Sequence, residues 1–281
     1  MTALFIGLQA ILPQHLLSRV IGGLADLERP IWLKNILITL FMQTYGIALD
    51  EAEHTQAGQY RHFNHFFTRA LQDGARPLAG SRYLSPADGV LSQRGNVEDG
   101  KLVQAKGRWY DTRGLLAGSD AEASSFDNGS FATVYLSPKD YHRVHMPMSG
   151  TLRMTRYIPG DLFAVNARTT AGVDQLFARN ERLVCLFDTA GGQLAVVLVG
   201  AMVVAGIETV WGGVESPHPG TIRERRFNPE DAPTLAAGEE LGRFFLGSTV
   251  VLLAEDSDLQ WQAEPGDSVL VRAALANSST L

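Results

Sequence analysis

Three residues that are far apart in the sequence carry the side chains needed to activate a hydroxyl group: Asp88, His145 and Ser248. An imidazole with a pKa of about 6.5 can take a proton from a serine hydroxyl and return it near neutral pH. A carboxylate can hold the imidazole in the required tautomer. The set therefore predicts nucleophilic chemistry at Ser248, with His145 as the base and Asp88 as the group that orients it.

The neighbours of Ser248 indicate what its hydroxyl would attack. Ser248 follows Gly247 inside the apolar run 244–253, which has the composition of a strand. A glycine inside such a run marks a bulge or a close backbone approach, and its missing Cβ permits a strained geometry. The hydroxyl could attack the carbonyl of Gly247, so this dipeptide is a candidate self-processing site. Gly247, Ser248 and Thr249 are equally the residues of an ordinary turn between strands.

Asp88 and the histidines lie in two short motifs. Asp88 belongs to Ser-Pro-Ala-Asp-Gly at 85–89, a turn context in which an aspartate commonly caps its own backbone. His142 and His145 belong to Tyr-His-Arg-Val-His-Met-Pro at 141–147, where His145 follows a predicted strand and precedes a turn. Each motif alone favours a structural role, so the functional interpretation depends on the motifs meeting in space.

The composition limits the class of protein. The chain has 281 residues, of which 45% are hydrophobic and 19% charged, which is less than the usual quarter. Its net charge of −6 and the absence of a long Lys/Arg run give no support to a nucleic-acid partner. The single cysteine, Cys185, lies in an apolar run and is expected in the core. No Cys/His spacing typical of zinc occurs, so we expect no metal site.

The N-terminal residues have the pattern of amphipathic helices. Three segments between residues 4 and 42 repeat apolar residues at helical spacing, and the sparse cations Arg19, Arg29 and Lys34 are expected on the polar faces. None reaches the roughly 18 consecutive apolar residues of a spanning helix, and no signal-peptide pattern is present. Such helices cover a core, form a subunit contact or lie on a membrane surface.

The remainder of the chain predicts a β-rich body. From Arg76 onward, short apolar runs alternate with Gly, Asn, Asp and Pro. The expected fold class is α+β, with a predominantly β body of sandwich-like or barrel-like antiparallel sheets behind the N-terminal helices. We expect a helical region at 1–70 and a β-rich catalytic region at 71–281. The clearest predicted strands are 89–93, 131–136, 182–187, 194–204 and 248–253.

Taken together, these motifs resemble the bacterial phosphatidylserine decarboxylase proenzymes. The central feature is the Leu-Gly-Ser-Thr sequence at 246–249, which occurs with both motifs described above. The similarity extends from the N-terminal helices to about Leu253. Further segments that carry it are 157–166, 177–182 and 206–211.

The resemblance implies a self-cleaving, pyruvoyl-dependent enzyme. Cleavage between Gly247 and Ser248 would give a β chain of residues 1–247 and an α chain of residues 248–281, and Ser248 would become a covalent pyruvoyl group. His145 and Asp88 would assist the cleavage, while His142 would assist decarboxylation or protonation. The amine of phosphatidylserine would form a Schiff base with the pyruvoyl carbonyl, and loss of CO2 would yield phosphatidylethanolamine for phospholipid biosynthesis.

The substrate implied by the resemblance also implies a location. A diacyl lipid is reached at a bilayer surface, so residues 1–70 would bind the cytoplasmic face of the cell membrane as a peripheral region. The α and β chains would remain paired. Members of the family are commonly dimeric, so a dimer of these pairs is the implied oligomer.

Two other classes of protein remain open from the residues. A serine hydrolase would use Asp88, His145 and Ser248 on added substrates without cleaving itself, although Ser248 lacks the Gly-x-Ser-x-Gly context. A non-enzymatic lipid-binding β domain would use all of the motifs as turns. Within the decarboxylases, a relative acting on another serine-headed lipid is a further alternative.

Overall fold

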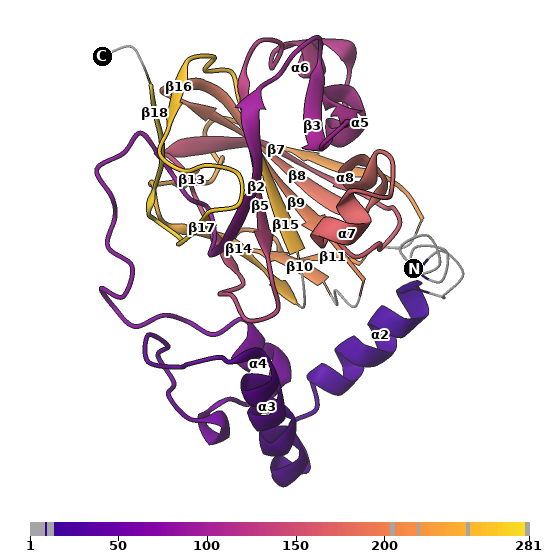
Figure 1. The fold of residues 1–281 in the computed structure, drawn as a ribbon, viewed down its shortest axis with the longest axis vertical. Coiled ribbons are helices and arrows are strands. Elements are labelled where there is room, and N and C mark those ends of the chain that lie inside the picture. Colours follow the sequence, from indigo (N-terminus) through magenta and orange to yellow (C-terminus); the bar gives the residue numbers. More distant parts are fainter. Residues whose placement is uncertain (1–8, 10–13, 203–205, 218–219, 246–247, 279–281) are drawn as a thin grey trace.

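The computed structural model describes residues 9, 14–202, 206–217, 220–245 and 248–278. Antiparallel sheets make up most of the fold, and helices cluster at one end and along one face (Figure 1). The predicted α+β class with a β-rich body is therefore confirmed. The first predicted helical segment and the dipeptide Leu246-Gly247 lie outside the described residues.

Among the described residues, nine strands form the largest sheet, which is open at both edges. Its order is β12-β7-β8-β9-β15-β5-β2-β17, with β13 also paired to β7. The central strand β15 pairs with β5 and β9 along its whole length. The bounds are β2 (Gly89–Asn96), β5 (Ser130–Leu136), β7 (Gly150–Ile158), β8 (Arg182–Thr189), β9 (Gly192–Gly200), β12 (Arg223–Arg226), β13 (Thr234–Leu235), β15 (Ser248–Ala254) and β17 (Ser268–Val269).

Two smaller sheets in the described part of the chain cover one face of the large sheet. One has the order β11-β10-β14-β6 and the other β1-β18-β16. Val250 and Leu252 of β15 contribute to the core between these layers, together with Phe244 and Leu275. The bounds are β1 (Tyr83–Leu84), β6 (Arg143–His145), β10 (Gly206–Thr209), β11 (Gly213–Ser216), β14 (Glu240–Phe245), β16 (Leu259–Trp261) and β18 (Ala274–Ser278).

A hairpin and short helices cover the opposite face of the large sheet. Val251 and Leu253 of β15 contribute to a second core there, which also contains Tyr110 and Phe177. Since alternate residues of β15 enter two different cores, the strand has the near-continuous apolar sequence that identified it. The elements are β3 (Lys101–Ala105), β4 (Arg108–Asp111), α5 (Thr112–Leu116), α6 (Asp120–Ser124), α7 (Ala167–Thr170) and α8 (Leu176–Arg179).

Three neighbouring strands of the large sheet continue into three neighbouring strands of the four-stranded sheet. In the large sheet the order is β9-β15-β5, and in the smaller sheet it is β10-β14-β6. Each pair is consecutive in the chain, namely β9 with β10, β14 with β15, and β5 with β6. The segment between Phe245 and Ser248 is therefore the middle one of three crossings between sheets. Ser248 is the first residue of the central strand.

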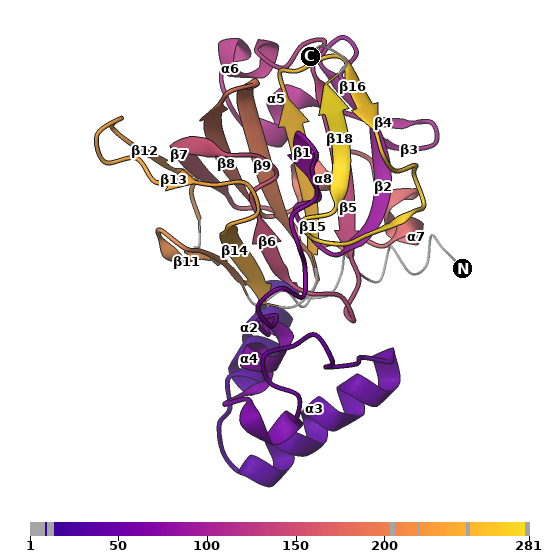
Figure 2. The ribbon, with the colours of Figure 1, turned by 90° about the vertical axis from the view of Figure 1, so that its left-hand side faces the viewer.

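The N-terminal helices lie together at one end of the β body (Figures 1 and 2). Ile38 and Phe66 form a small core with Tyr60. The side chain of His62 caps α4 by accepting a hydrogen bond from the backbone N–H of His65. The elements are α2 (Gln14–Ala25), α3 (Ile31–Tyr45), the 3-10 turn η1 (Ala57–Gln59) and α4 (Phe63–Phe67).

The outer surface of α2 and α3 is apolar, and one predicted position is wrong. Lys34, expected on a polar face, is buried at 5% exposure, and its Nζ donates to the carbonyls of Ala57 and Tyr60. The exposed positions are instead large apolar side chains, which reverses the usual arrangement of a surface helix. These side chains are Leu16, Val20, Leu24, Ile31, Trp32, Ile36, Leu37 and Leu40.

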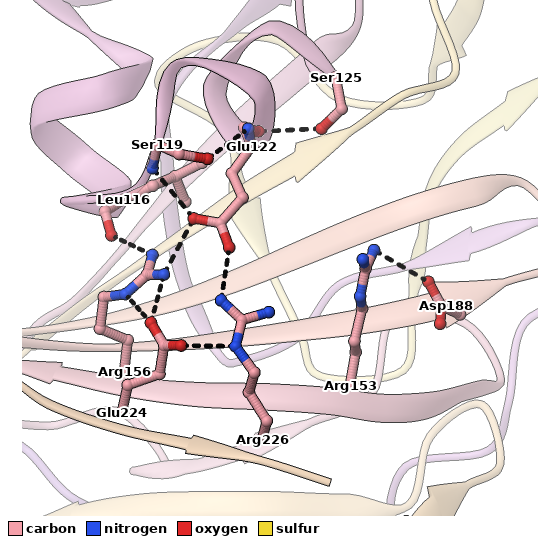
Figure 3. A network of polar contacts seen from close by, with 9 residues as sticks. All are labelled: Leu116, Ser119, Glu122, Ser125, Arg153, Arg156, Asp188, Glu224 and Arg226. Atoms are coloured by element: carbon pink, nitrogen blue, oxygen red, sulfur yellow. Dashed lines mark hydrogen bonds and ion pairs between the residues drawn. The ribbon is translucent and has the colours of Figure 1, made fainter. Parts of the chain in front are cut away.

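An ion-pair network holds the edge strand β12 against β7 and α6 (Figure 3). The side chain of Arg156 is 5% exposed, and its guanidinium pairs with Glu122 at 2.9 Å and Glu224 at 2.5 Å. Arg226 joins the same two carboxylates at 3.3 Å and 2.7 Å. The two arginines and two glutamates thus neutralise one another along an edge that would otherwise present unpaired charge.

The strand predicted at 194–204 extends too far, since Ala201 and Met202 lie outside β9, and its last two positions, 203 and 204, lie outside the described residues. β9 ends at Gly200, where its backbone N–H bonds to the carbonyl of Glu181. Cys185 is buried in the core and free, as predicted.

Candidate active site

Ser248 is buried at the point where the chain enters the central strand. It is 0% exposed, and its Oγ has no hydrogen-bond partner among the described residues. By strand alternation its side chain shares a face with Val250 and Leu252, which is the face covered by the four-stranded sheet. A buried hydroxyl without a partner is costly and calls for an explanation. Within the described residues, no hydrogen bond holds this oxygen.

The strand register relates Ser248 to the Asp88 motif. Ser248 pairs with Leu136 of β5, and the neighbouring Tyr135 pairs with Val90 of β2. Gly89 therefore lies in the same row as Ser248, two strands away. With strands spaced about 4.8 Å apart, the two backbones are about 10 Å apart. The fold thus brings the Asp88 motif into the neighbourhood of Ser248 across one intervening strand.

His145 is a neutral base whose ring is fixed on both sides. Its Nδ1 lies 2.8 Å from the carbonyl oxygen of Gly238, and its Nε2 lies 2.9 Å from the hydroxyl of Tyr141. A carbonyl can only accept, so Nδ1 carries the proton and Nε2 accepts from Tyr141. Burial lowers the pKa of His145 to about 4, and burial raises the pKa of Tyr141. At neutral pH the ring is therefore an uncharged acceptor at Nε2.

The carboxylate of Asp88 is engaged by groups other than His145. Its Oδ1 accepts from the backbone N–H of Val271 at 2.7 Å, and its Oδ2 accepts from Arg76 at 3.1 Å. Burial raises the pKa of this carboxyl, and these two donors act against the rise. In this structure Gly238 and Tyr141, rather than Asp88, hold the ring of His145. The role of Asp88 in orienting the base stays a prediction.

His142 occupies an apolar environment next to the helical region. Its Nδ1 donates to the carbonyl of Asp140 at 2.8 Å, and its ring centroid lies 4.0 Å from that of Phe67 in α4. Burial lowers its pKa to about 3. Its Nε2 is buried and, within the described ranges, has no partner. This nitrogen is a free proton acceptor at neutral pH.

The sequence did not identify several residues that shape this site. Tyr141 lies inside the quoted motif but received no role, and Arg76 and Gly238 belong to no motif. A further buried acid, Glu181, is 4% exposed and accepts a hydrogen bond from the hydroxyl of Ser216. The contacts of Gly238 and Glu181 join residues remote in sequence, so no local signal reveals them, whereas Tyr141 lies only four positions from His145.

The described part of the chain contains no group of three His, Cys, Asp or Glu side chains that could hold a metal ion. Within the same part, no helix has both the length and the apolarity required to cross a membrane.

The fold and the site together define a β-rich protein with a buried serine at a sheet crossing and two buried, neutral histidines at β6 of the adjoining four-stranded sheet. Comparisons with known proteins give the class a name. The phosphatidylserine decarboxylase family profile matches residues 63–277, and a second profile, described as PSD, matches residues 4–46.

Curated relatives match over nearly the whole chain. Phosphatidylserine decarboxylase proenzyme from Alcanivorax borkumensis is 53% identical over 277 residues, covering 97% of this chain and 95% of that protein. The proenzyme from Ectopseudomonas mendocina is 50% identical over 281 residues, covering 98% of each chain. The one from Azotobacter vinelandii is 52% identical over 263 residues, covering 92% of each. The chain belongs to the phosphatidylserine decarboxylase family, and it is an enzyme.

Proposed function

We propose that the chain cleaves itself between Gly247 and Ser248 and then decarboxylates phosphatidylserine to phosphatidylethanolamine at a pyruvoyl group formed from Ser248. The observation that carries the proposal is the buried Ser248 Oγ, which has no hydrogen-bond partner among the described residues. The relatives named as proenzymes support a processed chain.

The cleavage chemistry follows from the residues around Ser248. Ser248 Oγ attacks the carbonyl carbon of Gly247 as its proton passes to a base, and the peptide C–N bond breaks to leave an ester and a free amine. Elimination of the Cα proton and the Gly247 carboxylate gives dehydroalanine. Its imine tautomer takes up water and releases ammonia. We assign the base to His145, since its Nε2 is unprotonated at neutral pH, with Asp88 as a supporting group.

The residues fit a backbone-linked ketone at position 248. The unpartnered Oγ already occupies a buried site flanked by strands on both sides, so the group formed there would be sheltered from bulk water. A pyruvoyl group supplies an electrophilic carbonyl that binds an amine and accepts the electron pair left when CO2 departs. We assign His142 to hold or deliver a proton at its free Nε2, in an apolar setting next to Phe67.

The helical region 1–70 is proposed as the membrane-binding part of the molecule, attached peripherally at the cytoplasmic face. Trp32 is 64% exposed and Ile31 62% exposed, and they belong to the row of apolar side chains on α2 and α3. A patch of this kind on a soluble surface is costly, whereas it gains free energy in a lipid headgroup layer. The contact of His142 with Phe67 connects this region to the proposed active site. The β-rich remainder, 71–281, is the proposed catalytic region.

Intact mass under denaturing conditions tests the self-cleavage. We expect two fragments, residues 1–247 and 248–281, with the smaller one lighter by one ammonia than a peptide that begins with serine. The Ser248→Ala variant should remain a single chain. Release of CO2 from phosphatidylserine by the processed protein then tests the decarboxylation. A single full-length mass that persists on incubation would contradict the proposal and favour a serine hydrolase.

Membrane binding has a matched control in the chain. Trp32→Glu should weaken sedimentation with phosphatidylglycerol–phosphatidylethanolamine vesicles by about tenfold, because it removes apolar contact area and adds a charge. Trp109→Glu replaces an exposed tryptophan of β4, a strand that lies far from α2 and α3 (Figure 2), and should leave binding unchanged. Equal effects of both changes, or none, would count against this assignment.

A further inference from the structure

The turn at Val271 and Arg272 lies among the groups that we assign to self-cleavage. It connects β17 to β18, within the same C-terminal segment that begins with Ser248. Arg272 has φ of 68°, a left-handed conformation that costs a non-glycine residue about 1 kcal/mol or more. Its backbone N–H bonds to the carbonyl of Ser85 at 3.0 Å, in the motif that contains Asp88. The surrounding contacts therefore hold a turn that the backbone alone would not favour.

Arg272 and His145 share one hydrogen-bond acceptor. The carbonyl oxygen of Gly238 accepts from Nε of Arg272 at 2.9 Å and from Nδ1 of His145 at 2.8 Å. Gly238 has φ of 77°, and a Cβ there would lie 2.2 Å from Leu78. The carbonyl is thus held in a tight turn between the two donors. Loss of the Arg272 side chain would remove one of the two donors that hold this carbonyl, and would so loosen the acceptor that positions Nδ1 of His145.

The same turn also reaches Asp88. The backbone N–H of Val271 donates to Oδ1 of Asp88 at 2.7 Å, and Arg76 donates to Oδ2. Nη1 of Arg272 donates to the carbonyl of Arg76 at 3.3 Å. Two adjacent residues of the C-terminal segment therefore contact both members of the predicted pair, Asp88 directly and His145 through Gly238.

The charge of Arg272 supports the same role for His145 as the contacts of Arg272 do. The charged and titratable groups around His145 are Tyr141 and Arg143 on its own segment, Glu240 on β14 and Arg272 on the C-terminal segment. Burial, Arg272 and Arg143 lower the pKa of His145, whereas its bond to Gly238 and the charge of Glu240 raise it. Arg272 thus favours the neutral form of His145, which is the form able to accept a proton.

We propose that Arg272 is a positioning residue for His145, and that the Val271–Arg272 turn completes the self-cleavage centre only when the C-terminal segment has docked. Cleavage before docking would release residues 248–281 as a free peptide. A centre that needs a turn within this segment cannot act until the segment has reached its place. The inference rests on the proposed function, since it concerns the same cleavage.

Cleavage rates of full-length variants across pH 4 to 9 test the inference. Arg272→Gly suits the left-handed backbone and removes only the side chain. We expect it to slow cleavage by about 10-fold to 100-fold at pH 7, because displacement of a catalytic base has effects of this size. On the acid side, the pH at which the variant cleaves at half its maximal rate should rise by about one unit, because His145 loses a neighbouring positive charge. Arg272→Lys retains the charge and should keep the acid limb near that of wild type.

Arg94→Gln is the matched control. Arg94 also binds the C-terminal segment, at Ala263 and Glu264, but does not contact the His145 cluster. Thermal midpoints of each variant in the Ser248→Ala background, which stays uncleaved, show whether folding is retained. Wild-type cleavage kinetics in Arg272→Gly would overturn the inference, as would equal slowing by Arg94→Gln. A wild-type chain that never cleaves would overturn the proposed function and this inference together, whereas the first two outcomes leave the proposed function standing.

Discussion

Replacing Arg76 by methionine should destabilise the protein by leaving the carboxylate of Asp88 buried without its cation. The two side chains are 9% and 10% exposed, and Arg76 Nη2 lies 3.1 Å from Asp88 Oδ2. Removal of one partner of a buried pair costs about 3 kcal/mol or more, because the remaining charge keeps its desolvation penalty. At about 2 °C per kcal/mol for a chain of this size, the thermal midpoint should fall by roughly 6 °C.

A double variant that removes both charges distinguishes an unpaired buried charge on Asp88 from a simple loss of packing around Arg76. Arg76→Met with Asp88→Asn removes both charges, so we expect it to be about 2 kcal/mol more stable than Arg76→Met alone. Both variants and their parent are compared in the Ser248→Ala background, by thermal unfolding of a single uncleaved chain. The reasoning is refuted if the double variant is no more stable than Arg76→Met.

The direction in which the stability loss of Arg76→Met changes with pH gives a second check. Burial already raises the pKa of Asp88 above its ordinary value of 3.8, and loss of Arg76 would raise it further. The folded state then binds a proton more tightly than the unfolded state. The penalty in Arg76→Met should therefore be complete at neutral pH and shrink as the pH falls through the raised pKa. A penalty that is the same at pH 4 and pH 7 would contradict the electrostatic origin.

Three further outcomes test other parts of the structure. Ser248→Ala should raise stability by about 1 kcal/mol in thermal unfolding, because it removes a buried hydroxyl without a partner among the described residues; a loss would mean that the hydroxyl is bonded. Arg156→Met should cost about 3 kcal/mol because two partly buried glutamates lose their main partner, whereas Arg153→Met, whose partner lies 4.0 Å away at an exposed position, should cost less than about 0.5 kcal/mol. Phe67→Ala should raise the pKa of His142 from about 3, because water then reaches the ring, and an NMR titration would show this change. The same substitution should lower the stability by about 3 kcal/mol. An unchanged titration would show that Phe67 does not shield the ring.

The strands were predictable from sequence because their pattern reflects burial on one or both faces. β15 is apolar at every position from Val250 to Ala254, and this pattern predicted a buried strand. The crossing of three strands between two sheets was not predictable, because strand order depends on pairings between segments remote in sequence. The strand predicted at 194–204 was too long for the same reason, because the end of a strand also depends on its pairing partners. The apolar run continues past Gly200, but β9 ends there, and the described residues Ala201 and Met202 lie outside the strand.

The site was predictable in its residue types but not in its contacts. Asp88, His145 and Ser248 were named from chemistry, and the fold brings their motifs into one region. Of the two groups that fix His145, the carbonyl of Gly238 could not be found, because it is a backbone group 93 positions away. Tyr141 is only four positions away, but a tyrosine in that motif does not by itself indicate a hydrogen bond to the ring. Lys34 was misplaced for a related reason. A helical pattern shows which residues share a face. It does not show that the backbone carbonyls of Ala57 and Tyr60, in and directly after η1, pack against that face and accept hydrogen bonds from Lys34.

The position of the proposed cleavage at a crossing between sheets has a consequence for whether the processed molecule can refold. A cut there removes a connection between two layers and leaves every hydrogen bond of β15 to β5 and β9 in place. The product chain would supply the central strand β15 and the short strand β17 of a sheet whose other seven strands belong to the other chain. To reassemble after denaturation, it would have to insert between two strands as a separate body and lose its translational freedom. Folding would thus be available once, to the intact chain, and the processed enzyme would persist by slow unfolding rather than by its ability to fold again.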